Sequence, residues 1–311
     1  MQVDILSLFP GYFASPLNES MLKRAQEKGA LTVSLHDIRN YTDDKHQRVD
    51  DRPYGGGPGM VMMAEPVVKA LRDVKKENSH VVYLSPQGAK LDAKKALELA
   101  QKPSLVLLCG HYEGIDERAL ALVDEQISIG DYVLTNGCLA ALVLMDTVIR
   151  FLPGVLGDSE SAKQDSFQSK LLDCPHFTKP VEFEGVNVPE VLLSGHHKNI
   201  ERWRQAEKIE KTIDVRPDLW FETTGDEVKD SFIKLFVKNL NVSLKFYQNV
   251  VKGTINQIDD RKAIVSIDNY KFYLVQEEVQ DLSLNKKILF SRPFTKKQRV
   301  IKDPDGYYWS I

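Results

Sequence analysis

The stretch from residue 107 to residue 151 constrains the fold more than any other part of this chain. It reads LLCGHYEGIDERALALVDEQISIGDYVLTNGCLAALVLMDTVIRF: an apolar run, a glycine-bounded turn, a second β-type run, and an apolar helix that delivers Arg150 at its far end. Its turns at 109–114, 129–134 and 135–137 place glycines and backbone amides at the ends of β-type runs. Open α/β sheets bind ligands at the ends of their strands. The stretch therefore predicts a small-molecule site in an α/β domain.

The segments before this stretch alternate between strand-like and helix-like patterns. Strand, helix, strand order is typical of a parallel α/β sheet, and continuous apolar runs are typical of its central strands. We therefore expect residues 1 to about 156 to form one α/β domain with about five strands. The expected strands are Gln2–Leu8, Leu31–Ile38, His80–Leu84 and Ser104–Leu108, and the expected helices are Glu19–Lys28, Pro66–Asp73 and Asp92–Gln101, the last with Asp92 as its N-cap.

A long polar segment, residues 39–59, interrupts this alternation and ends in the sequence YGGGPGM at 54–60. Connections in compact α/β domains are usually much shorter, and long ones are often functional. Clustered glycines let the backbone approach a flat or charged ligand closely. They are equally typical of a flexible hinge, and composition alone leaves both interpretations open.

Composition and missing motifs exclude several classes of protein. The chain has 311 residues, a net charge of −3 and three cysteines without a CxxC pair, which favours reduced thiols and no structural metal site. No apolar run is long enough to cross a membrane and the N-terminus lacks a signal-peptide pattern, so we expect a cytoplasmic protein without membrane contact. The chain lacks GxGxxG after a strand, GxxxxGK[ST] and HExxH. These absences argue against dinucleotide-dependent redox enzymes, P-loop kinases and zinc proteases.

The second half of the chain changes character twice. Residues 157–168 are polar and predict a linker or mobile loop, and a helix is expected from His196 to about Thr212. This helix opens with basic residues around Trp203, a pattern that suits contact with an RNA backbone but also a solvated face with the tryptophan in a core. Beyond Trp220 an acidic linker leads into a β-rich segment that we expect to be a separate small module.

Eight motifs together resemble one family, the bacterial TrmD-type tRNA (guanine-N1) methyltransferases of the SPOUT superfamily. They are YGGGPGM (54–60), SPQG (85–88), CGHYEGIDER (109–118), SIGDYVL (128–134), RFLPGVLG (150–157), DSF (165–167), LLDCPH (171–176) and VLLSGHHKNIERWR (191–204), in order over about residues 1–220. The resemblance implies a deep trefoil knot in the α/β domain, one of the rare exceptions to the rule against knots. It also implies a homodimer whose active site is shared between protomers, S-adenosylmethionine as methyl donor, and methylation of N1 of guanosine 37 in tRNA.

The resemblance also implies roles for individual residues. Asp165, contributed by the opposite protomer, would be the general base that takes the N1 proton, and Arg150 would stabilise negative charge on the guanine. The expected cofactor residues are Tyr83, Leu84, Ser85, Pro86, Gly110, Tyr112, Glu113, Ile129, Gly130, Tyr132, Leu134, Asn136, Gly137 and Ala140. The expected substrate residues are Asp50, Gly55, Gly56, Gly57, Gly59 and Ser166 at the guanine, and Lys198, Arg202 and Arg204 on the anticodon stem. No metal ligands are expected among the site residues, and the sequence leaves a Mg²⁺ requirement open.

The departures from the family are local. Where the family usually has Ser-Gly-Gly-Glu-Leu-Pro, residues 135–140 read Thr-Asn-Gly-Cys-Leu-Ala, and His111 stands where arginine is common. Asn136 tolerates a positive φ better than most residues, so the loop should survive, with added bulk beside the cofactor. We therefore expect Asn136→Gly to tighten cofactor binding.

The last part of the chain lies outside the usual family. Residues 232–237, 239–247 and 303–308 resemble a glyoxalase/bleomycin-resistance (vicinal oxygen chelate) fold, here degenerate and without metal ligands. The expected organisation is a knotted α/β domain (1–156), a mobile linker (157–170), a small helical tRNA-binding domain (171–221), a second linker (222–230) and an α+β accessory module (231–311). Two other functions fit parts of the sequence less well: a tRNA-binding protein without turnover, which the presence of both Arg150 and Asp165 argues against, and a phosphate-cradling hydrolase, which would need a P-loop lysine.

Overall fold

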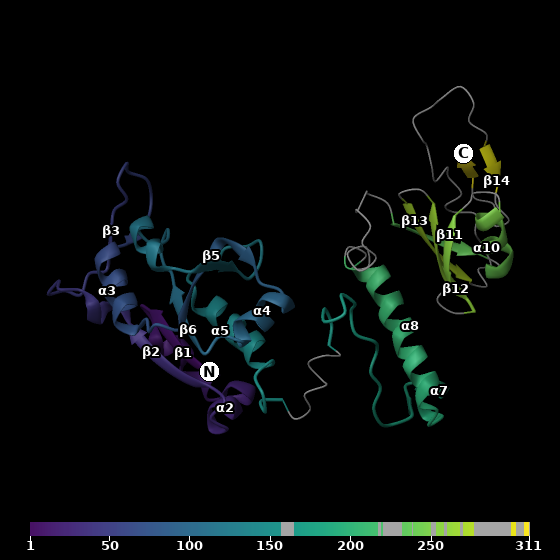
Figure 1. Ribbon diagram of the computed structural model, residues 1–311, viewed down its shortest axis with the longest axis horizontal. Coiled ribbons are helices and arrows are strands. Elements are labelled where there is room, and N and C mark those ends of the chain that lie inside the picture. Colours follow the sequence, from purple (N-terminus) through teal and green to yellow (C-terminus); the bar gives the residue numbers. More distant parts are fainter. Residues whose placement is uncertain are drawn as a thin grey trace. The chain divides into compact units, whose positions relative to one another are not determined.

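The computed structural model describes residues 1–156, 165–216, 219, 232–237, 239–249, 253–257, 260–267, 270–276, 300–302 and 308–310. The chain divides into two compact units, Met1–Gln168 and Ser169–Ile311 (Figure 1). The expected linker residues 157–164 and 222–230 lie outside the described residues, so the finer domain boundaries stay a prediction. Within the described ranges, no helix is both long and apolar enough to cross a membrane.

The first unit is built on a five-stranded sheet in the order β2-β1-β6-β5-β7. Every neighbouring pair in it is parallel, which confirms the predicted parallel α/β architecture. All six residues of β6 are buried, as the uninterrupted apolar run predicted. The strands are β1 (Gln2–Ser7), β2 (Thr32–Asp37), β5 (Ser79–Lys90), β6 (Ser104–Cys109) and β7 (Glu125–Ser128).

Helices cover both faces of this sheet, as Figure 1 shows for α3 on one side and α4 and α5 on the other. Successive side chains of β1 point to opposite faces, so Val3 and Ile5 pack into one buried cluster and Leu6 into another. The first cluster includes apolar side chains of α2, α4 and α5, and the second includes those of α3. The helices are α1 (Ala14–Leu17), α2 (Ser20–Glu27), α3 (Ala64–Val74), α4 (Ala93–Ala100) and α5 (Cys138–Ile149), with 3₁₀ turns η1 (Pro10–Phe13), η2 (Ile38–Tyr41) and η3 (Glu117–Leu122).

Most element positions agree with the sequence prediction to within a few residues. The predicted N-cap of α4 is confirmed, because the Asp92 carboxylate accepts a hydrogen bond of 2.7 Å from the backbone N–H of Lys95. The β5 strand is longer than the predicted segment 80–84. Both Leu84 and Ala89 lie opposite Ile127 of β7, so residues 85–88 form an irregular bulge between them.

Two short strands flank the glycine-rich segment. These strands, β3 (Asp50–Asp51) and β4 (Val61–Met62), pair antiparallel. The turn between them therefore projects as a loop from the domain, and we call residues 52–60 the glycine loop.

The second unit begins with a helical segment. It contains a short hairpin whose two strands, β8 (Glu182–Phe183) and β9 (Val186–Asn187), have two residues each. Two helices follow, α7 (Glu190–Leu193) and the long α8 (His197–Val215). The Thr212 hydroxyl is fully buried and accepts a hydrogen bond of 2.8 Å from the backbone N–H of Leu172. That bond holds the start of the segment against the end of α8.

The remaining described residues form a β-α-β-β-β run and a separate antiparallel pair, β14 and β15. The sheet of the run has the order β10-β13-β12-β11, and α10 packs its buried side chains Leu240, Leu244 and Tyr247 against that sheet. The resemblance of this part to the glyoxalase fold stays a prediction, and its residues 303–307 lie outside the described residues. The elements are β10 (Phe232–Val237), α10 (Leu240–Asn249), β11 (Thr254–Gln257), β12 (Lys262–Ile267), β13 (Tyr270–Gln276), β14 (Val300–Lys302) and β15 (Tyr308–Ser310).

The bulge in β5 generates a stability prediction at Gly88. A Cβ there would lie 2.3 Å from the backbone carbonyl carbon of Gln126, far inside van der Waals contact. We expect Gly88→Ala to lower the free energy of unfolding by about 2 kcal/mol or more, because backbone must move to admit the methyl group. Gly11→Ala is the matched control, since a Cβ at Gly11 meets nothing within 4 Å. Equal denaturation midpoints for the two variants would contradict this packing.

Candidate functional site

The ends of three neighbouring strands enclose a cavity of about 440 Å³. Its wall consists of the β5 bulge, the turn after β6, the turn after β7 and the first turn of α5. All of the predicted cofactor residues line it: Tyr83, Leu84, Ser85, Pro86, Gly110, Tyr112, Glu113, Ile129, Gly130, Tyr132, Leu134, Asn136, Gly137 and Ala140. The structure therefore brings together the turns that the sequence placed at strand ends.

Further residues line the same cavity without having been predicted. Gln87, His111, Val133 and Thr135 are sequence neighbours of predicted residues, so adjacency within each turn could have found them. Glu117 and Leu120 are different. They come from η3, a short 3₁₀ turn whose approach to the cavity has no local sequence signal.

A backbone contact joins two of these turns. The Gly137 N–H donates a hydrogen bond of 2.9 Å to the carbonyl oxygen of Gly110. A Cβ on Gly137 would lie 2.9 Å from the Cα of Cys109, so a side chain there would displace one of the two segments. The start of α5 is therefore pressed directly against the end of β6.

The Tyr83 side chain packs against the wall of the cavity at Gly110. It is almost fully buried, and a Cβ on Gly110 would lie 2.9 Å from its ring. Burial, and then the nearby Glu117 carboxylate, raise the pKa of Tyr83 above its ordinary value, although hydrogen bonds with Ser85 and the Ile115 backbone oppose the shift. The phenol is therefore protonated at neutral pH, and its burial holds it in a fixed position.

The glycine loop is attached to the cavity wall. The Glu113 N–H donates a hydrogen bond of 3.0 Å to the Met60 carbonyl, and the Met62 N–H donates one of 2.9 Å to the Gly114 carbonyl. Gly59 has a φ of 82°, and a Cβ there would lie 2.4 Å from Oε1 of Glu113. The left-handed backbone favours glycine at this position, and a larger residue would also displace the Glu113 side chain.

A side-chain contact adds a second attachment. The Tyr112 hydroxyl donates a hydrogen bond to the Asp50 carboxylate, and the pKa of Tyr112 is raised by burial and by this partner. Tyr112 itself adopts a left-handed φ of 57°, an uncommon conformation for a bulky residue that is often found at functional sites. The predicted guanine-binding residue Asp50 and the predicted cofactor residue Tyr112 are therefore in direct contact.

The predicted catalytic pair lies elsewhere. Arg150 caps the C-terminal end of α5, and its guanidinium donates a hydrogen bond to the Asp165 carboxylate of the same chain, next to Ser166. Neither Arg150 nor Asp165 lines the cavity, which meets α5 at its opposite end. A helix of 12 residues is about 18 Å long at 1.5 Å per residue. Within one chain, the pair and the cavity are thus separated by the length of α5.

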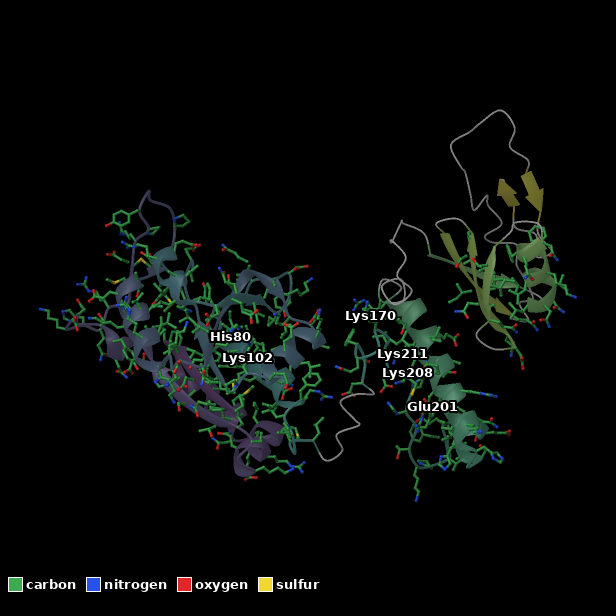
Figure 2. The ribbon with its side chains drawn as sticks, in the orientation of Figure 1. His80, Lys102, Lys170, Glu201, Lys208 and Lys211 are labelled. Atoms are coloured by element: carbon green, nitrogen blue, oxygen red, sulfur yellow. The ribbon has the colours of Figure 1, made fainter. Side chains whose placement is uncertain are left out.

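The predicted RNA-contacting residues of α8 fall on two faces. Lys198 and Arg202 are exposed, four residues apart and on one face of the helix, whereas Arg204 lies about 200° round from Arg202. Arg204 shares its face with Lys208, which is labelled on α8 in Figure 2. The structure therefore brings Lys198 and Arg202 together but not Arg204. Trp203 is half-buried, with its ring 6.3 Å from that of Phe177.

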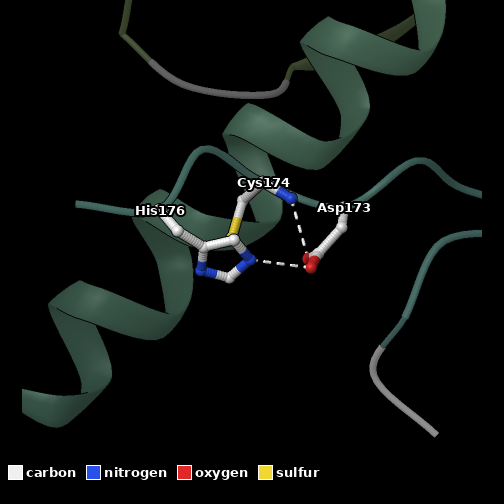
Figure 3. A group of neighbouring side chains, drawn as sticks. All are labelled: Asp173, Cys174 and His176. Atoms are coloured by element: carbon white, nitrogen blue, oxygen red, sulfur yellow. Dashed lines mark hydrogen bonds and ion pairs between the residues drawn. The ribbon is translucent and has the colours of Figure 1, made fainter. Parts of the chain in front are cut away.

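A cluster of Asp173, Cys174 and His176 lies beside α8 (Figure 3). The Asp173 carboxylate accepts a hydrogen bond of 2.8 Å from Nε2 of His176 and forms an ion pair of 3.1 Å with Lys208. Burial alone would raise the pKa of Asp173, but these partners outweigh it and hold the pKa at about 2. The ligand atoms lie within 4.8 Å of one another, yet the ammonium group already neutralises the carboxylate and burial raises the pKa of the Cys174 thiol. We interpret the cluster as an ion-pair network that ties residues 171–176 to α8.

The conformation of Asn136 differs from the sequence prediction. Asn136 does not adopt a positive φ; its side-chain Oδ1 instead accepts a hydrogen bond of 2.9 Å from the backbone N–H of Cys138. That N–H is one of the unpaired donors at the start of α5. Asn136 is therefore accommodated because its side chain caps the helix. The prediction that it fits the loop by adopting a positive φ was wrong.

Comparison with known proteins gives a consistent result. The model of a family described as tRNA (Guanine-1)-methyltransferase TrmD matches residues 1–222. A Protochlamydia amoebophila protein named tRNA (guanine-N(1)-)-methyltransferase is 61% identical over 220 residues, 70% of this chain and 99% of that protein. A protein of the same name from Carboxydothermus hydrogenoformans is 54% identical over 220 residues, 70% of this chain and 87% of that protein. One from Chlamydia trachomatis serovar D is 50% identical over 298 residues, 96% of this chain and 77% of that protein.

The Asn136 contact generates a prediction opposite to that from sequence alone. We expect Asn136→Gly to lower the free energy of unfolding by about 1 kcal/mol, because the first turn of α5 loses its side-chain acceptor. We also expect no tighter binding of S-adenosylmethionine, the cofactor that the resemblance implies, when titrated by calorimetry. Asn136→Asp keeps an acceptor oxygen and is the matched control for stability. Tighter binding by the glycine variant would show that bulk, not capping, governs this position.

Proposed function

The chain belongs to the TrmD family of tRNA (guanine-1)-methyltransferases, and we propose that it moves a methyl group from S-adenosylmethionine to N1 of guanosine 37 in tRNA. Methylation of guanine N1 in tRNA follows from the family itself, represented by relatives with 50% and 61% identity. The identity of the donor and the position in tRNA are the proposal. The observation that carries it is the cavity lined by every residue predicted to hold the donor.

The cavity fits S-adenosylmethionine in size and in the nature of its wall. Small-molecule sites commonly measure about 300 to 1,000 Å³, and this one measures about 440 Å³. Side chains are kept out of its wall at Gly110, Gly130 and Gly137, where a Cβ would clash at 2.9 Å or less. When bound there, the sulfonium supplies an activated methyl group for in-line attack by the guanine.

The remaining chemistry belongs to the chain. Guanine N1 carries a proton and is a poor nucleophile until a base removes it; Asp165 accepts that proton. Negative charge then spreads towards O6 of the guanine, and the Arg150 guanidinium stabilises it. The two side chains are in contact, so the guanine edge that offers N1 and O6 side by side can meet both.

The active site is shared between two copies of the chain. Within one chain, Arg150 and Asp165 lie about 18 Å from the cavity, at the far end of α5. Transfer needs reacting atoms about 3 Å apart, so the catalytic pair of one protomer serves the cavity of its partner. Supporting this arrangement, α5 exposes an apolar stripe of Leu139 (47%) and Val143 (46%) next to the cavity-rim residue Val133 (81%). We propose that this surface is buried in a homodimer.

The tRNA is held at two places. Asp50, Ser166 and the glycine loop (Gly55, Gly56, Gly57 and Gly59) line the place of the guanine. Lys198 and Arg202 grip the phosphates of the anticodon stem from one face of α8, while Arg204 makes its contact from another. Ion pairs with phosphate are sequence-independent, so these residues set affinity and leave the choice of base to the guanine site.

The C-terminal extension is dispensable for methyl transfer. The Protochlamydia amoebophila relative aligns over 99% of its own length to only 70% of this chain, so that protein lacks a counterpart of the extension. The Chlamydia trachomatis relative aligns to 96% of this chain, so the extension is shared with some members. We assign it an accessory role in stability or tRNA contact.

The first prediction concerns the catalytic pair. With labelled S-adenosylmethionine and transcribed tRNA, we expect Asp165→Ala to lower the rate of methyl transfer by about 10²- to 10⁴-fold, because the N1 proton loses its acceptor. Arg150→Ala should lower it by a comparable factor. A tRNA with adenosine at position 37 is the substrate control. Full activity of Asp165→Ala, or equal labelling of the adenosine tRNA, would refute the assignment.

Mixing the two variants then tests the shared site. A mixed dimer of Arg150→Ala and Asp165→Ala protomers contains one cavity served by both intact residues only if the two residues come from different chains. Because we propose that both come from the partner, we expect no recovery from this mixture, and recovered activity would contradict that part of the proposal. A protomer with both Arg150→Ala and Asp165→Ala, mixed with the cavity variant Gly137→Trp, should in contrast be active in one site, and absence of activity from that mixture would overturn the proposed sharing.

A separate prediction concerns the extension. We expect a chain ending at residue 224 to keep methyl transfer within about tenfold of the full chain, since a relative of that length carries the same name. Sedimentation should confirm that the truncated chain is folded and dimeric. Complete loss of transfer by such a dimer would contradict the accessory role.

A further inference from the structure

Tyr54 has a placement that the proposed function does not yet use. Its side chain is fully exposed, although a tyrosine ring usually finds apolar contacts in a folded protein. The three glycines that follow it have φ values of 87°, 81° and 114°, and no atom lies within 4 Å of where their Cβ atoms would be. The tip of the glycine loop therefore holds an aromatic ring in solvent with both faces free.

The base of the loop, in contrast, is fixed to the cavity. Gly59 packs against the Glu113 side chain, and the hydrogen bond from Glu113 N–H to Met60 carbonyl continues that contact. Glu113 lines the cavity, but Tyr54 does not. The Tyr54 ring therefore lies outside the cavity, on a loop whose base is attached to the cavity wall.

An exposed cation follows the turn to which the glycine loop is attached. Arg118 comes four residues after Gly114, whose carbonyl accepts the Met62 N–H. It is oriented by hydrogen bonds of 2.9 and 2.7 Å to its neighbour Asp116, and its guanidinium remains largely exposed. An exposed aromatic face and an exposed cation are the two groups that bind single-stranded nucleotides, one by stacking and the other through phosphate.

We propose that Tyr54 stacks on the nucleobase that neighbours the methylated guanine and holds it outside the cavity. This inference rests on the proposed function. To present N1 to a methyl group, the guanine must leave the stack of the anticodon loop, so its neighbour loses a stacking partner. The free face of Tyr54 replaces that partner, and Arg118 meets the backbone phosphate beside it. Every nucleobase has a stacking face, so this contact tolerates any neighbour and leaves selection to the guanine site.

The test uses the full-length protein and four variants at one position. Stacking of a base on an aromatic ring is worth about 1 to 3 kcal/mol, so we expect Tyr54→Ala to lower kcat/KM for tRNA by about 10- to 100-fold. Tyr54→Phe and Tyr54→Trp should stay within about threefold of wild type. Tyr54→Leu, apolar but without an aromatic face, should resemble Tyr54→Ala. Binding of S-adenosylmethionine, measured by calorimetry, should be the same in all five proteins.

A spectroscopic readout separates stacking from a structural role. With 2-aminopurine placed beside the target guanosine, binding to wild type should leave its fluorescence quenched, because the base exchanges one stacking partner for another. Binding to Tyr54→Ala should leave that base unstacked and raise its emission. If Tyr54 had only a structural role, Tyr54→Ala would bind tRNA more weakly, but the bound 2-aminopurine would have the same emission in both proteins.

The outcomes are distinguishable. Absence of methyl transfer by the wild-type protein on any tRNA would remove the proposed function itself. Wild-type transfer with an equally active Tyr54→Ala would leave that function standing and overturn the stacking role. Full activity of Tyr54→Leu would likewise overturn it, by showing that any apolar group suffices. Because Tyr54 contacts no core residue, the melting temperatures of all variants should match, and a lowered one would also count against the inference.

Discussion

The close approach of two backbone segments, Gly137 against Cys109 and Gly110, is the constraint on which the rest of the site depends. A side chain at Gly137 would place its Cβ 2.9 Å from the Cα of Cys109, so glycine alone lets the start of α5 meet the end of β6. The hydrogen bond from Gly137 to Gly110 then fixes two walls of the cavity to each other. The β5 bulge is held by a similar approach of Gly88 to Gln126, so close backbone contacts position several segments of the cavity wall.

The same contact determines where the proposed catalytic residue Arg150 lies. Once α5 starts at the cavity, its length of 12 residues carries Arg150 about 18 Å away. The helix is buried along most of its surface, so it cannot bend back, and its remaining exposed apolar stripe faces outwards. A chain built this way holds the cavity at one end of α5 and the proposed catalytic pair at the other. A second copy is the simplest means of bringing opposite halves together, and the apolar stripe supplies a reason for the two copies to associate.

Sequence patterns predicted those features that depend on local chemistry. Apolar periodicity located the parallel strands, Asp92 was recognisable as an N-cap, and glycines at strand ends located the turns that line the cavity. The failures have two causes: a local alternative that the sequence prediction did not consider, and packing against segments distant in sequence. Asn136 was expected in left-handed backbone, but the free N–H of Cys138 offers it a better partner. Arg204 was grouped with Arg202 by proximity in sequence, although the helical repeat separates their faces. The approach of η3 to the cavity, and the extra length of β5, follow from tertiary packing alone.

Coupling between the cavity and the glycine loop follows from the turn that they share. Residues 110–114 form one wall of the cavity, and through Tyr112 and Glu113 the same turn contacts Asp50 and Gly59 of the loop stems. A shift of this turn at the cavity must therefore also move the stems of the glycine loop. In-line transfer demands that donor and acceptor be placed within a fraction of an ångström, and two independently mobile elements could not maintain that alignment. Tyr112 has an unfavourable left-handed backbone conformation. Relaxing it would move both the cavity wall and the loop stem that Tyr112 contacts, and the packing of these two segments therefore maintains it.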